Sequence, residues 1–440
     1  MYLLYSLALT ILFLALLPYF IYQAMRHGKY ADSFKERLGW LPVSSLSDGR
    51  KTVWVHAVSV GEFLAARPLV ERIKRELPDF RLVVSTTTLT GQRLARAESP
   101  ARFDAVFYFP FDWTFAVRRS LNQVKPSLVV ILETELWPNF LRECRRRGIL
   151  TVIANGRISP RSFARYKRVR RFIARALNDV SLLIMQSEAD AERAVLLGAR
   201  ADHVRACGNL KYDVASEAHV SNLQSETAEK IDNLFALSSS PRLIIAGSTA
   251  PGEENILLAA LSRVRKQQGL NDARLILAPR HPERFNEVAS LIAQSGFRFA
   301  RRSEDALANT DSRTADVILL DTIGELAALY RFAAVVFVGG SLVPRGGHNI
   351  IEPALYAKPI IVGPHTENFR QIVSDFAQAD AVVQINATDE AVSSSFTREL
   401  IRLCSDTESA QAMGARAKDI LHKSRGATEC VIAAILELEI

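Results

Sequence analysis

Short apolar runs alternate with amphipathic stretches along most of the chain. The apolar runs are rich in Val, Ile and Leu, as is typical of strands buried on both faces of a parallel sheet. Stretches between them, such as Leu69–Leu77 and Phe140–Arg147, combine Arg, Glu, Ala and Leu in a helix-like pattern. We therefore predict an α/β protein with helices on both faces of parallel sheets. The strand-like runs are Thr52–Val58, Leu82–Ser85, Ala105–Phe109, Leu128–Leu132, Leu150–Ala154, Leu182–Gln186, Leu243–Ala246, Arg274–Ala278, Asp316–Leu320, Ala334–Val338 and Pro359–Val362.

The alternation falls into two series. The strand signal lapses over Lys211–Pro241, where Ser238–Ser240 interrupts the chain, and it then restarts. Two series of this kind predict two doubly wound domains, with ligands bound at the carboxyl ends of the strands in a cleft between the domains. The expected boundaries are 51–212 for the N-terminal domain, 213–240 for a linker, 241–407 for the C-terminal domain and 408–440 for C-terminal helices that pack back toward the N-terminal domain.

The N-terminal segment Tyr2–Tyr22 contains no charged residue. About 20 apolar residues suffice to cross a bilayer as a helix. No Lys or Arg precedes the segment and several basic residues follow it, so the positive-inside rule places the rest of the chain in the cytoplasm. A cleaved signal peptide would need a positive n-region and a small-residue cleavage site, and both are missing. We predict an anchor helix over 1–25 and a basic linker over 26–50 with a Ser-rich stretch at Ser44–Asp48; Pro18 also allows a kinked or shallow insertion. The basic residues after the segment are Arg26, His27, Lys29, Lys35 and Arg37.

Composition narrows the class of protein only slightly. The chain has 440 residues with 48% hydrophobic and 23% charged positions, which fits a folded protein of two domains. A net charge of +8 suits nucleic acid, an anionic membrane surface or an acidic substrate, and it is also compatible with solubility alone. The four cysteines are far apart and form no CxxC pair or metal spacing, so we predict reduced thiols in a reducing compartment. They are Cys144, Cys207, Cys404 and Cys430.

Glu62 lies in the sequence HAVSVGEF, which follows the first predicted strand. At the carboxyl end of a strand, its carboxylate is placed to act as a general base that deprotonates a sugar hydroxyl. The spacing Ser59-x-x-Glu62 also fits a capping box, in which the carboxylate only closes a helix N-terminus. Pro68 favours a helix that begins near it, which would leave Glu62 in the preceding loop. Both roles stay open.

Further charged residues follow other strands of the first domain. Glu133 and Glu135 lie two apart in ETELWPN and share one face of an extended chain, where they could act in acid–base chemistry or stabilise a transition state. They also fit a charged loop before a helix that starts at Pro138. Because the chain contains no D-x-D motif, we discount a metal role. Lys211, in GNLKYD, is placed either to neutralise a phosphate or to be a solvated linker residue.

The second domain places small and anion-binding residues at its strand ends. Gly247 and Ser248 offer backbone amides for close approach to a phosphate, and Arg280 suits a phosphate or a carboxylate. A glycine-rich stretch, Gly339–Gly347, then opens a predicted helix in which Glu352 is placed to bind ribose hydroxyls. The chain has neither G-x-G-x-x-G nor G-x-x-x-x-G-K-[ST], so dinucleotide and P-loop sites are excluded. Together these residues indicate a nucleotide site.

Six motifs, spread from the first predicted strand into the last part of the second domain, resemble those of the Kdo transferases of lipopolysaccharide synthesis, which transfer an acidic eight-carbon sugar. The resemblance implies a GT-B fold, with two Rossmann-like domains facing across a cleft, and an inverting transfer of Kdo from CMP-Kdo to a lipid A precursor. It implies inner-membrane lipids as a further partner, no nucleic acid, no cofactor and no essential metal. The motifs are HAVSVGE, the STTT of Ser85–Thr88, ETELWPN, GNLKYD, APRHPERF and GGSLVPRGGHNIIEPA.

The resemblance also implies roles for individual residues. Glu62 matches the catalytic base, while Glu133 and Lys211 match transition-state stabilisers, with Glu135 as the second choice to Glu133. Gly247 and Ser248 join the CMP-binding set by their position at a strand end. The residues that match CMP contacts are Pro279, Arg280, Ile323, Gly324, Glu325, Asn349, Ile350, Ile351 and Glu352.

An acidic donor and a phosphorylated acceptor would explain the basic surplus of the chain. The alternatives are another GT-B transferase or a sugar-nucleotide epimerase, which needs no anchor, and a membrane-tethered nucleotide-binding regulator without catalysis. The basic residues of the first domain that are candidates for an acidic-substrate surface, each equally compatible with ordinary helix solvation, are Arg142, Arg145–Arg147, Arg157, Arg161, Arg165, Lys167, Arg168, Arg170 and Arg171.

Overall fold

The computed structural model describes residues 1–27, 31–43, 49–99, 102–214, 222–304, 310–386 and 389–438. Lys29, the Ser44–Asp48 stretch and residues 215–221 of the predicted linker lie outside these ranges. The chain forms two compact units. Unit 1 combines Met1–Val214 with Ser424–Ile440, and unit 2 is Ala215–Lys423.

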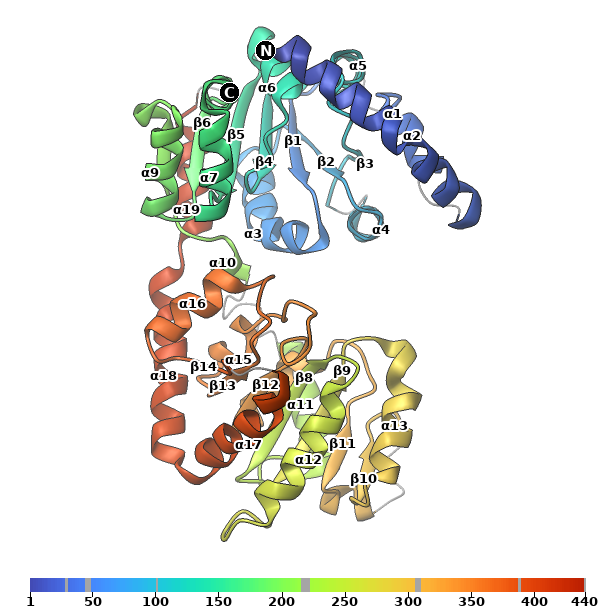
Figure 1. The fold of residues 1–440 in the computed structure, drawn as a ribbon, viewed down its shortest axis with the longest axis vertical. Helices are drawn as coiled ribbons and strands as arrows, with labels where there is room; N and C mark the ends of the chain where they lie inside the picture. The colour runs from blue at the N-terminus through green and yellow to red at the C-terminus, as the bar shows by residue number, and fades with distance from the viewer. Residues whose placement is uncertain are drawn as a thin grey trace. The chain divides into compact units, whose positions relative to one another are not determined.

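Unit 1 is built on a parallel sheet of seven strands in the order β3-β2-β1-β4-β5-β6-β7 (Figure 1). All six predicted strands of this unit are present, and their ends lie within two residues of the expected positions. The edge strand β7 was not predicted, because its three residues are partly exposed and not uniformly apolar. The strands are β1 (Thr52–Ala57), β2 (Arg81–Thr86), β3 (Ala105–Tyr108), β4 (Leu128–Leu132), β5 (Leu150–Gly156), β6 (Leu182–Met185) and β7 (Val204–Ala206).

Helices cover both faces of this sheet. Successive residues of a strand point to opposite faces, so Trp54 of β1 packs in one apolar cluster with Phe140, while Val55 packs in the other with Leu69 and Ile432. This double burial explains why the strands are apolar at nearly every position. The helices of unit 1 are α1 (Tyr2–His27), α2 (Ala31–Arg37), α3 (Val60–Glu76), α4 (Leu89–Glu98), α5 (Thr114–Val124), α6 (Pro138–Arg146), α7 (Pro160–Arg168), α8 (Arg170–Asn178), α9 (Glu188–Leu197), α10 (Lys211–Val214) and α19 (Ala427–Leu436).

Unit 2 repeats this architecture with a second parallel sheet, in the order β10-β11-β9-β8-β12-β13-β14. The five predicted strands are present. The two edge strands β10 and β14 were not predicted, because they have only three and two residues and are half-exposed. The strands are β8 (Leu243–Thr249), β9 (Arg274–Pro279), β10 (Phe299–Arg301), β11 (Val317–Leu319), β12 (Val335–Val338), β13 (Ile360–Val362) and β14 (Val383–Gln384).

The C-terminal helices divide between the units at a point that differs from the expected boundary at 407/408. Phe396 of α17 and Met413 of α18 belong to the apolar core of unit 2. Only α19 returns to unit 1, where Ile432 is buried against the sheet. The helices of unit 2 are α11 (Asn222–Phe235), α12 (Glu253–Arg265), α13 (Phe285–Gln294), α14 (Leu326–Leu329), α15 (Ile351–Leu355), α16 (Arg370–Gln378), α17 (Asp389–Ser405) and α18 (Thr407–Ser424, all but its last residue).

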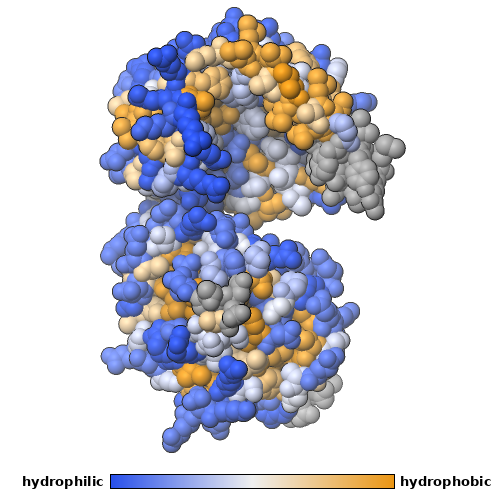
Figure 2. All heavy atoms as spheres, viewed as in Figure 1, coloured by the Kyte–Doolittle hydropathy of each residue, from blue (hydrophilic) through white to orange (hydrophobic). Residues whose placement is uncertain are grey.

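The N-terminal helix α1 lies against unit 1. The ring of Phe13 packs edge-on against Trp113 with centroids 4.8 Å apart, and the Ser6 hydroxyl accepts a hydrogen bond from the Asn139 amide at 3.0 Å. Its outer face carries exposed apolar side chains and contributes to an orange band in Figure 2. The membrane-spanning anchor that the sequence predicts is not found: within the described part of the chain, no helix combines the length and the apolar character needed to cross a bilayer.

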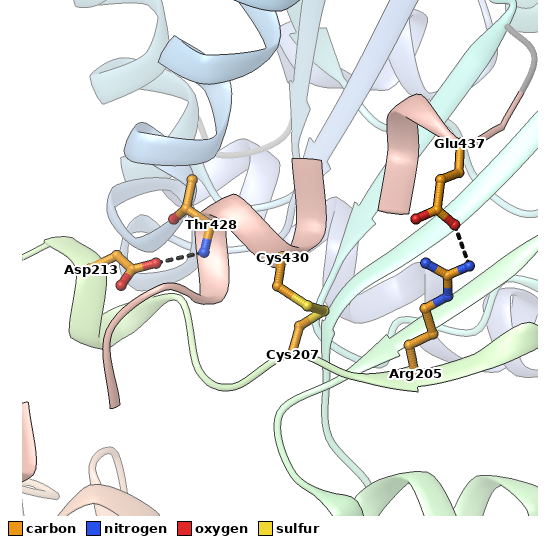
Figure 3. Close-up of a disulfide and its surroundings, with 6 residues drawn as sticks. All are labelled: Arg205, Cys207, Asp213, Thr428, Cys430 and Glu437. Atoms are coloured by element: carbon orange, nitrogen blue, oxygen red, sulfur yellow. Dashed lines mark hydrogen bonds and ion pairs between the residues drawn. A yellow bond between two sulfur atoms is a disulfide. The ribbon is translucent and has the colours of Figure 1, made fainter. Parts of the chain in front are cut away.

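A disulfide joins Cys207 to Cys430, with the two Cα atoms 5.5 Å apart (Figure 3). The prediction of four reduced thiols is therefore wrong for these two residues, whereas Cys144 and Cys404 are free and buried. The pair is 223 residues apart in sequence and meets only because α19 returns to pack beside the end of β7. Sequence spacing contains no trace of such a contact.

Candidate active site

The candidate residues of unit 1 lie at the carboxyl edge of its sheet. Strands β1 and β4 are neighbours at the point where the strand order reverses, and ligands of doubly wound sheets bind at such a point. Glu62 follows β1, and Glu133 is the first residue after β4. Parallel strands bring both carboxylates to this edge, as the sequence pattern predicts.

Ser59 and Glu62 form half of the capping box that the sequence allows: the Ser59 hydroxyl accepts the Glu62 N–H, but the Glu62 carboxylate does not bond to the Ser59 N–H among the contacts of the described residues. Helix α3 begins at Val60, with Ser59 as its N-cap, and Pro68 lies inside the helix. The alternative in which the helix begins near Pro68 and leaves Glu62 in a preceding loop is therefore wrong. One oxygen of the Glu62 carboxylate accepts the Val58 N–H at 2.7 Å and the other accepts the Ser59 hydroxyl at 3.0 Å. These bonds hold the carboxylate in one place, which a base also requires.

The electrostatics of Glu62 go beyond those of a helix cap. Burial and the nearby negative charge of Glu133 raise the pKa of Glu62 from 4.5 to about 7, although the bonds from Val58 and Ser59 act in the opposite direction. A general base works best when its pKa lies close to the working pH. A carboxyl that serves only as a cap near a helix N-terminus would be expected to ionise more readily, since the helix dipole stabilises negative charge there. Glu62 therefore combines fixed geometry with the acidity of a neutral-pH base.

Glu133 and Lys211 form an ion pair, with the Lys211 ammonium 3.2 Å from a Glu133 carboxylate oxygen. Glu133 has a left-handed backbone conformation with φ of 57°, which is uncommon for a residue with a side chain, and its N–H donates to the Ala154 carbonyl. The pKa of Glu135 is raised by burial and by Glu133. The structure thus brings Glu133 to Lys211 and places its charge second only to burial in its effect on Glu62.

Two asparagines that sequence reasoning did not assign fix the turn that carries Lys211. Asn155, fully buried at the end of β5, accepts the Leu210 N–H through its side chain at 3.0 Å. Asn209 accepts the Lys211 N–H, also at 3.0 Å. The sequence does carry a signal for Asn155, which follows an apolar run directly and precedes Gly156. An Asn in this position indicates a turn, because Asn tolerates the left-handed conformation that Asn155 adopts.

The turn is also tied to the returning C-terminal segment. The Asp213 carboxylate accepts the backbone N–H of Thr428 at 2.6 Å, at the start of α19 (Figure 3). It also accepts the N–H of Gly426 at 2.9 Å. Cys207, which forms the disulfide with Cys430, precedes Lys211 in the same turn, whereas Asp213 follows it. Lys211 is therefore held between a covalent link and a helix cap.

The candidate residues of unit 2 gather at the carboxyl edge of its sheet. Gly247 and Ser248 lie near the end of β8, and Pro279 is the last residue of β9. Pro279 pairs with Thr249, the last residue of β8. The turn at 323–325 follows β11, and the glycine-rich stretch follows β12, which pairs with β8. The sequence prediction placed these segments at strand ends, and the sheet order makes them neighbours.

Arg280 is exposed and lies near two polar residues of the glycine-rich segment. Its positive charge acts to lower the pKa of both His348 and Glu352, although burial dominates and raises the pKa of Glu352 overall. The Glu352 carboxylate accepts the Asn349 amide at 3.3 Å, and the Asn349 side-chain oxygen accepts the Ile351 N–H at 3.0 Å. Arg280, Asn349 and Glu352 thus form one cluster suited to a phosphorylated ribose.

Some predicted CMP contacts take a different form in the structure. The side chains of Ile350 and Ile351 are buried in the core, so only their backbone can meet a ligand. Gly247 is explained by packing, because a Cβ there would fall 2.2 Å from the Tyr330 hydroxyl oxygen. His348, which was not assigned, has its pKa lowered to about 4 by burial and therefore stays neutral at physiological pH.

The turn at 323–325 presents an unusual apolar tip. Ile323 is 81% exposed, and Gly324 beside it has a positive φ of 91°. The Glu325 carboxylate is held by Arg302 at 2.8 Å and by the Thr322 hydroxyl. Because the Glu325 carboxylate is already paired, it would help to bind a ligand by fixing the backbone of the turn, not by direct contact. Among the described residues, no group of three or more His, Cys, Asp or Glu side chains is arranged to hold a metal ion.

Two parallel seven-stranded sheets, each carrying polar residues at its carboxyl edge, define a doubly wound α/β protein of two units. The fold is similar to a crystal structure of a glycosyltransferase from Rickettsia africae, at a TM-score of 0.56 and 12% identity over 88% of this chain and 98% of the other. A family described as 3-deoxy-D-manno-octulosonic-acid transferase (kdotransferase) matches residues 32–214. A 3-deoxy-D-manno-octulosonic acid transferase of Haemophilus influenzae is 35% identical over 92% of this chain and 91% of its own. One of Bordetella pertussis is 32% identical over 87% and 86%.

The chain belongs to the Kdo transferase family. It is accordingly a glycosyltransferase that transfers Kdo in lipopolysaccharide synthesis. The resemblance of its motifs to this family, inferred from the sequence, is confirmed.

Proposed function

We propose that the enzyme moves Kdo from CMP-Kdo to a hydroxyl of a lipid A precursor in a single inverting displacement, with Glu62 as the base. The observation that carries the proposal is the carboxylate of Glu62, which is fixed by two hydrogen bonds and has a pKa of about 7 beside the Glu133–Lys211 ion pair. At neutral pH about half of such a group is ionised and ready to accept a proton.

In the proposed reaction, Glu62 accepts the proton of the acceptor hydroxyl as that oxygen attacks the anomeric carbon of Kdo. The bond from this carbon to the phosphate oxygen breaks, and CMP leaves with the bonding electrons. The sugar gains positive charge in the transition state, which the Glu133 carboxylate stabilises, while Lys211 and Arg280 meet the negative charge that grows on the phosphate. With two cationic side chains assigned to this task, we propose that no metal ion or other cofactor is essential.

We propose that the CMP moiety binds at the carboxyl edge of the unit 2 sheet. Asn349 and Glu352 are linked by a hydrogen bond, and Arg280 lies close enough to affect the pKa of Glu352. A carboxylate accepts hydrogen bonds from vicinal ribose hydroxyls, whereas a guanidinium binds phosphate in a bidentate manner. The exposed tip at Ile323 offers an apolar surface for the base.

The acceptor carries phosphates, and unit 1 offers a cationic surface for them. Seven basic side chains on α7 and α8 are exposed, and none of them forms an ion pair with an acidic residue in the part of the chain that the structure describes. Unpaired exposed cations attract anionic ligands at low ionic strength. These residues are Arg161, Arg165, Lys167, Arg168, Arg170, Arg171 and Arg175.

We propose that the protein attaches to the cytoplasmic face of the inner membrane through α1, which inserts partway into the bilayer. One side of α1 packs on unit 1 through Phe13 and Ser6. Its other side exposes apolar residues whose burial in lipid is favourable by about 25 cal/mol per Å². The exposed residues are Met1, Leu3, Leu4, Leu7, Ile11, Leu12, Leu14 and Leu16.

The proposal is tested by exchanging Glu62 for Gln and measuring the product formed from CMP-Kdo and a tetraacylated lipid A precursor by mass spectrometry. We expect the rate of transfer to fall by about a hundredfold or more, since general-base catalysis contributes roughly 10²–10⁴ in rate. Glu71→Gln is the matched control, because Glu71 lies on the same helix but is half-exposed and pairs with Arg102. Full-rate transfer by Glu62→Gln would refute the assignment of the base. CMP binding without turnover in the unaltered enzyme would instead indicate a nucleotide-binding regulator.

A further inference from the structure

Glu253, the first residue of α12, is completely buried, yet no cation among the described residues forms a hydrogen bond or an ion pair with its carboxylate. Instead, the carboxylate accepts four backbone N–H groups. One oxygen accepts Ala250 and Gly340, both at 2.8 Å, and the other accepts Ser341 at 3.0 Å and Leu342 at 2.9 Å. Only the bond from Ala250 is a local cap of α12; the other three reach a turn almost 90 residues further along the chain.

This arrangement changes the expected role of the Gly339–Ser341 amides. The sequence suggests that the glycine-rich stretch offers backbone N–H groups to a phosphate, but the amides of Gly340 and Ser341 already bind an anion that belongs to the protein. A donor phosphate therefore cannot use them without displacing Glu253. The carboxylate acts as an internal anion around which the turn is folded.

The turn that Glu253 holds leads directly to the proposed donor site. The Gly340 carbonyl accepts the Gly347 N–H at 2.8 Å, immediately before His348 and Asn349. A side chain on Gly340 would meet the His348 ring at 3.0 Å, so the two segments are in close contact. A shift of the 340–342 turn would be passed on to Asn349 and then to Glu352.

Close backbone packing leaves the 340–342 turn little room to take up another conformation if the Glu253 carboxylate is removed. A Cβ on Gly339 would fall 2.4 Å from the Ser248 carbonyl oxygen, and one on Gly363 would fall 2.0 Å from the Ser341 carbonyl oxygen. The Ser341 hydroxyl also accepts the Gly363 N–H at 2.9 Å. The backbone segments at the ends of β8, β12 and β13 are thus packed directly on one another, and Glu253 is bonded to the 340–342 turn among them.

We propose that Glu253 is a positioning residue for donor binding: its buried carboxylate orders the 340–342 turn, which in turn sets Asn349 and Glu352 for the nucleotide. This inference rests on the donor site proposed above. Glu253 touches no substrate in this scheme. Its loss should therefore weaken binding of the donor more than it slows the chemical step.

The test is Glu253→Gln, which keeps the shape of the side chain but replaces one acceptor oxygen by an amide that faces N–H donors. We expect the KM for CMP-Kdo to rise by about tenfold to a hundredfold, which is the weakening of binding expected when one or two hydrogen bonds to the nucleotide are no longer formed. The kcat at saturating donor and the KM for the lipid acceptor should change by less than about threefold. The KM for the donor should fall back in part in Glu253→Asp, which restores the carboxylate on a shorter stem; this variant also serves if Glu253→Gln does not fold.

Asp316→Asn is the matched control. Asp316 is another buried carboxylate of unit 2, but it lies just before the amino end of β11, where Arg298 and Arg265 bind it. We expect this variant to lower the melting temperature while leaving the KM for CMP-Kdo unchanged. If Asp316→Asn raises that KM as much as Glu253→Gln does, the effect is one of general stability and the inference is wrong.

Arg280→Ala separates failure of the inference from failure of the donor site. If Arg280→Ala raises the KM for CMP-Kdo and Glu253→Gln does not, the positioning role of Glu253 is refuted and the donor site stands. If neither variant changes that KM, the donor site itself is wrongly placed, and the inference falls with it.

Discussion

Changing Glu133 to Gln tests whether the raised pKa of Glu62 has the cause that the structure indicates. Burial is the largest influence on this pKa, the charge of Glu133 is the next, and Glu135 acts in the same direction as the weakest influence. Gln at position 133 keeps the size of the side chain and removes its charge. The pKa of Glu62 should therefore fall from about 7, without reaching its ordinary value of 4.5.

The size of the shift follows from Coulomb's law. Two carboxylates in one site repel by roughly 1–2 kcal/mol at an effective dielectric constant near 20. Since one pKa unit equals about 1.4 kcal/mol, Glu133→Gln should lower the pKa of Glu62 by about 0.8–1.5 units. Glu135→Gln should lower it by less, because Glu135 has the smaller effect.

The assay is the dependence of kcat/KM on pH, which reports the pKa of the base in the free enzyme. A base must be unprotonated, so activity is lost as the pH falls through its pKa, and the unaltered enzyme should reach half its maximal rate near pH 7. Glu133→Gln also breaks the ion pair with Lys211 and will lower the overall rate. The two enzymes are therefore compared by the pH at which kcat/KM falls to half its maximum on the acidic side, and not by the maximal value of kcat/KM.

Three results would refute this reasoning. An acidic limb that stays near pH 7 in Glu133→Gln would mean that Glu133 does not raise the pKa of Glu62. A larger shift in Glu135→Gln than in Glu133→Gln would reverse the order of the two charges. An acidic limb that persists near pH 7 in Glu62→Gln would belong to another group.

Three further predictions concern Lys211, the disulfide and α1. Lys211→Met should lower kcat, measured by CMP release, about a hundredfold or more, because the cation acts mainly on charge in the transition state. The KM should change by less, and a KM that rises as much as kcat falls would contradict this role. Reduction of Cys207–Cys430 should cost about 2–4 kcal/mol of stability and lower the melting temperature, and the double serine variant should not respond to dithiothreitol. The double variant Leu4→Glu, Leu7→Glu changes two exposed residues of α1 and should reduce co-sedimentation of the protein with anionic vesicles. Unchanged binding would rule out insertion of this face of α1 into the bilayer.

The strands of both sheets could be predicted because burial on two faces leaves a nearly continuous apolar run. Leu128–Leu132 is such a run, and all five of its residues are buried in β4. The edge strands β7, β10 and β14 have only one neighbour and two or three residues each, so they lack this signal.

The candidate site could be predicted as a set of strand ends but not as an electrostatic arrangement. The capping box at Ser59 is local and readable, whereas the pKa of Glu62 depends on Glu133, which only the pairing of β1 with β4 brings near. Glu253 reads as an ordinary acidic residue in the first turn of a helix. Its three long-range partners are backbone groups, which carry no sequence signature at all.

The disulfide described above has a topological consequence. Unit 2 is an insertion within unit 1, and Cys207 and Cys430 lie just outside the two points where the chain leaves and re-enters unit 1. The bond therefore closes the inserted domain into a covalent ring that begins and ends at one place on unit 1. A single protease nick anywhere within unit 2 would leave both fragments joined, so the nicked protein would fall apart on a denaturing gel only after the sulfur bridge is reduced.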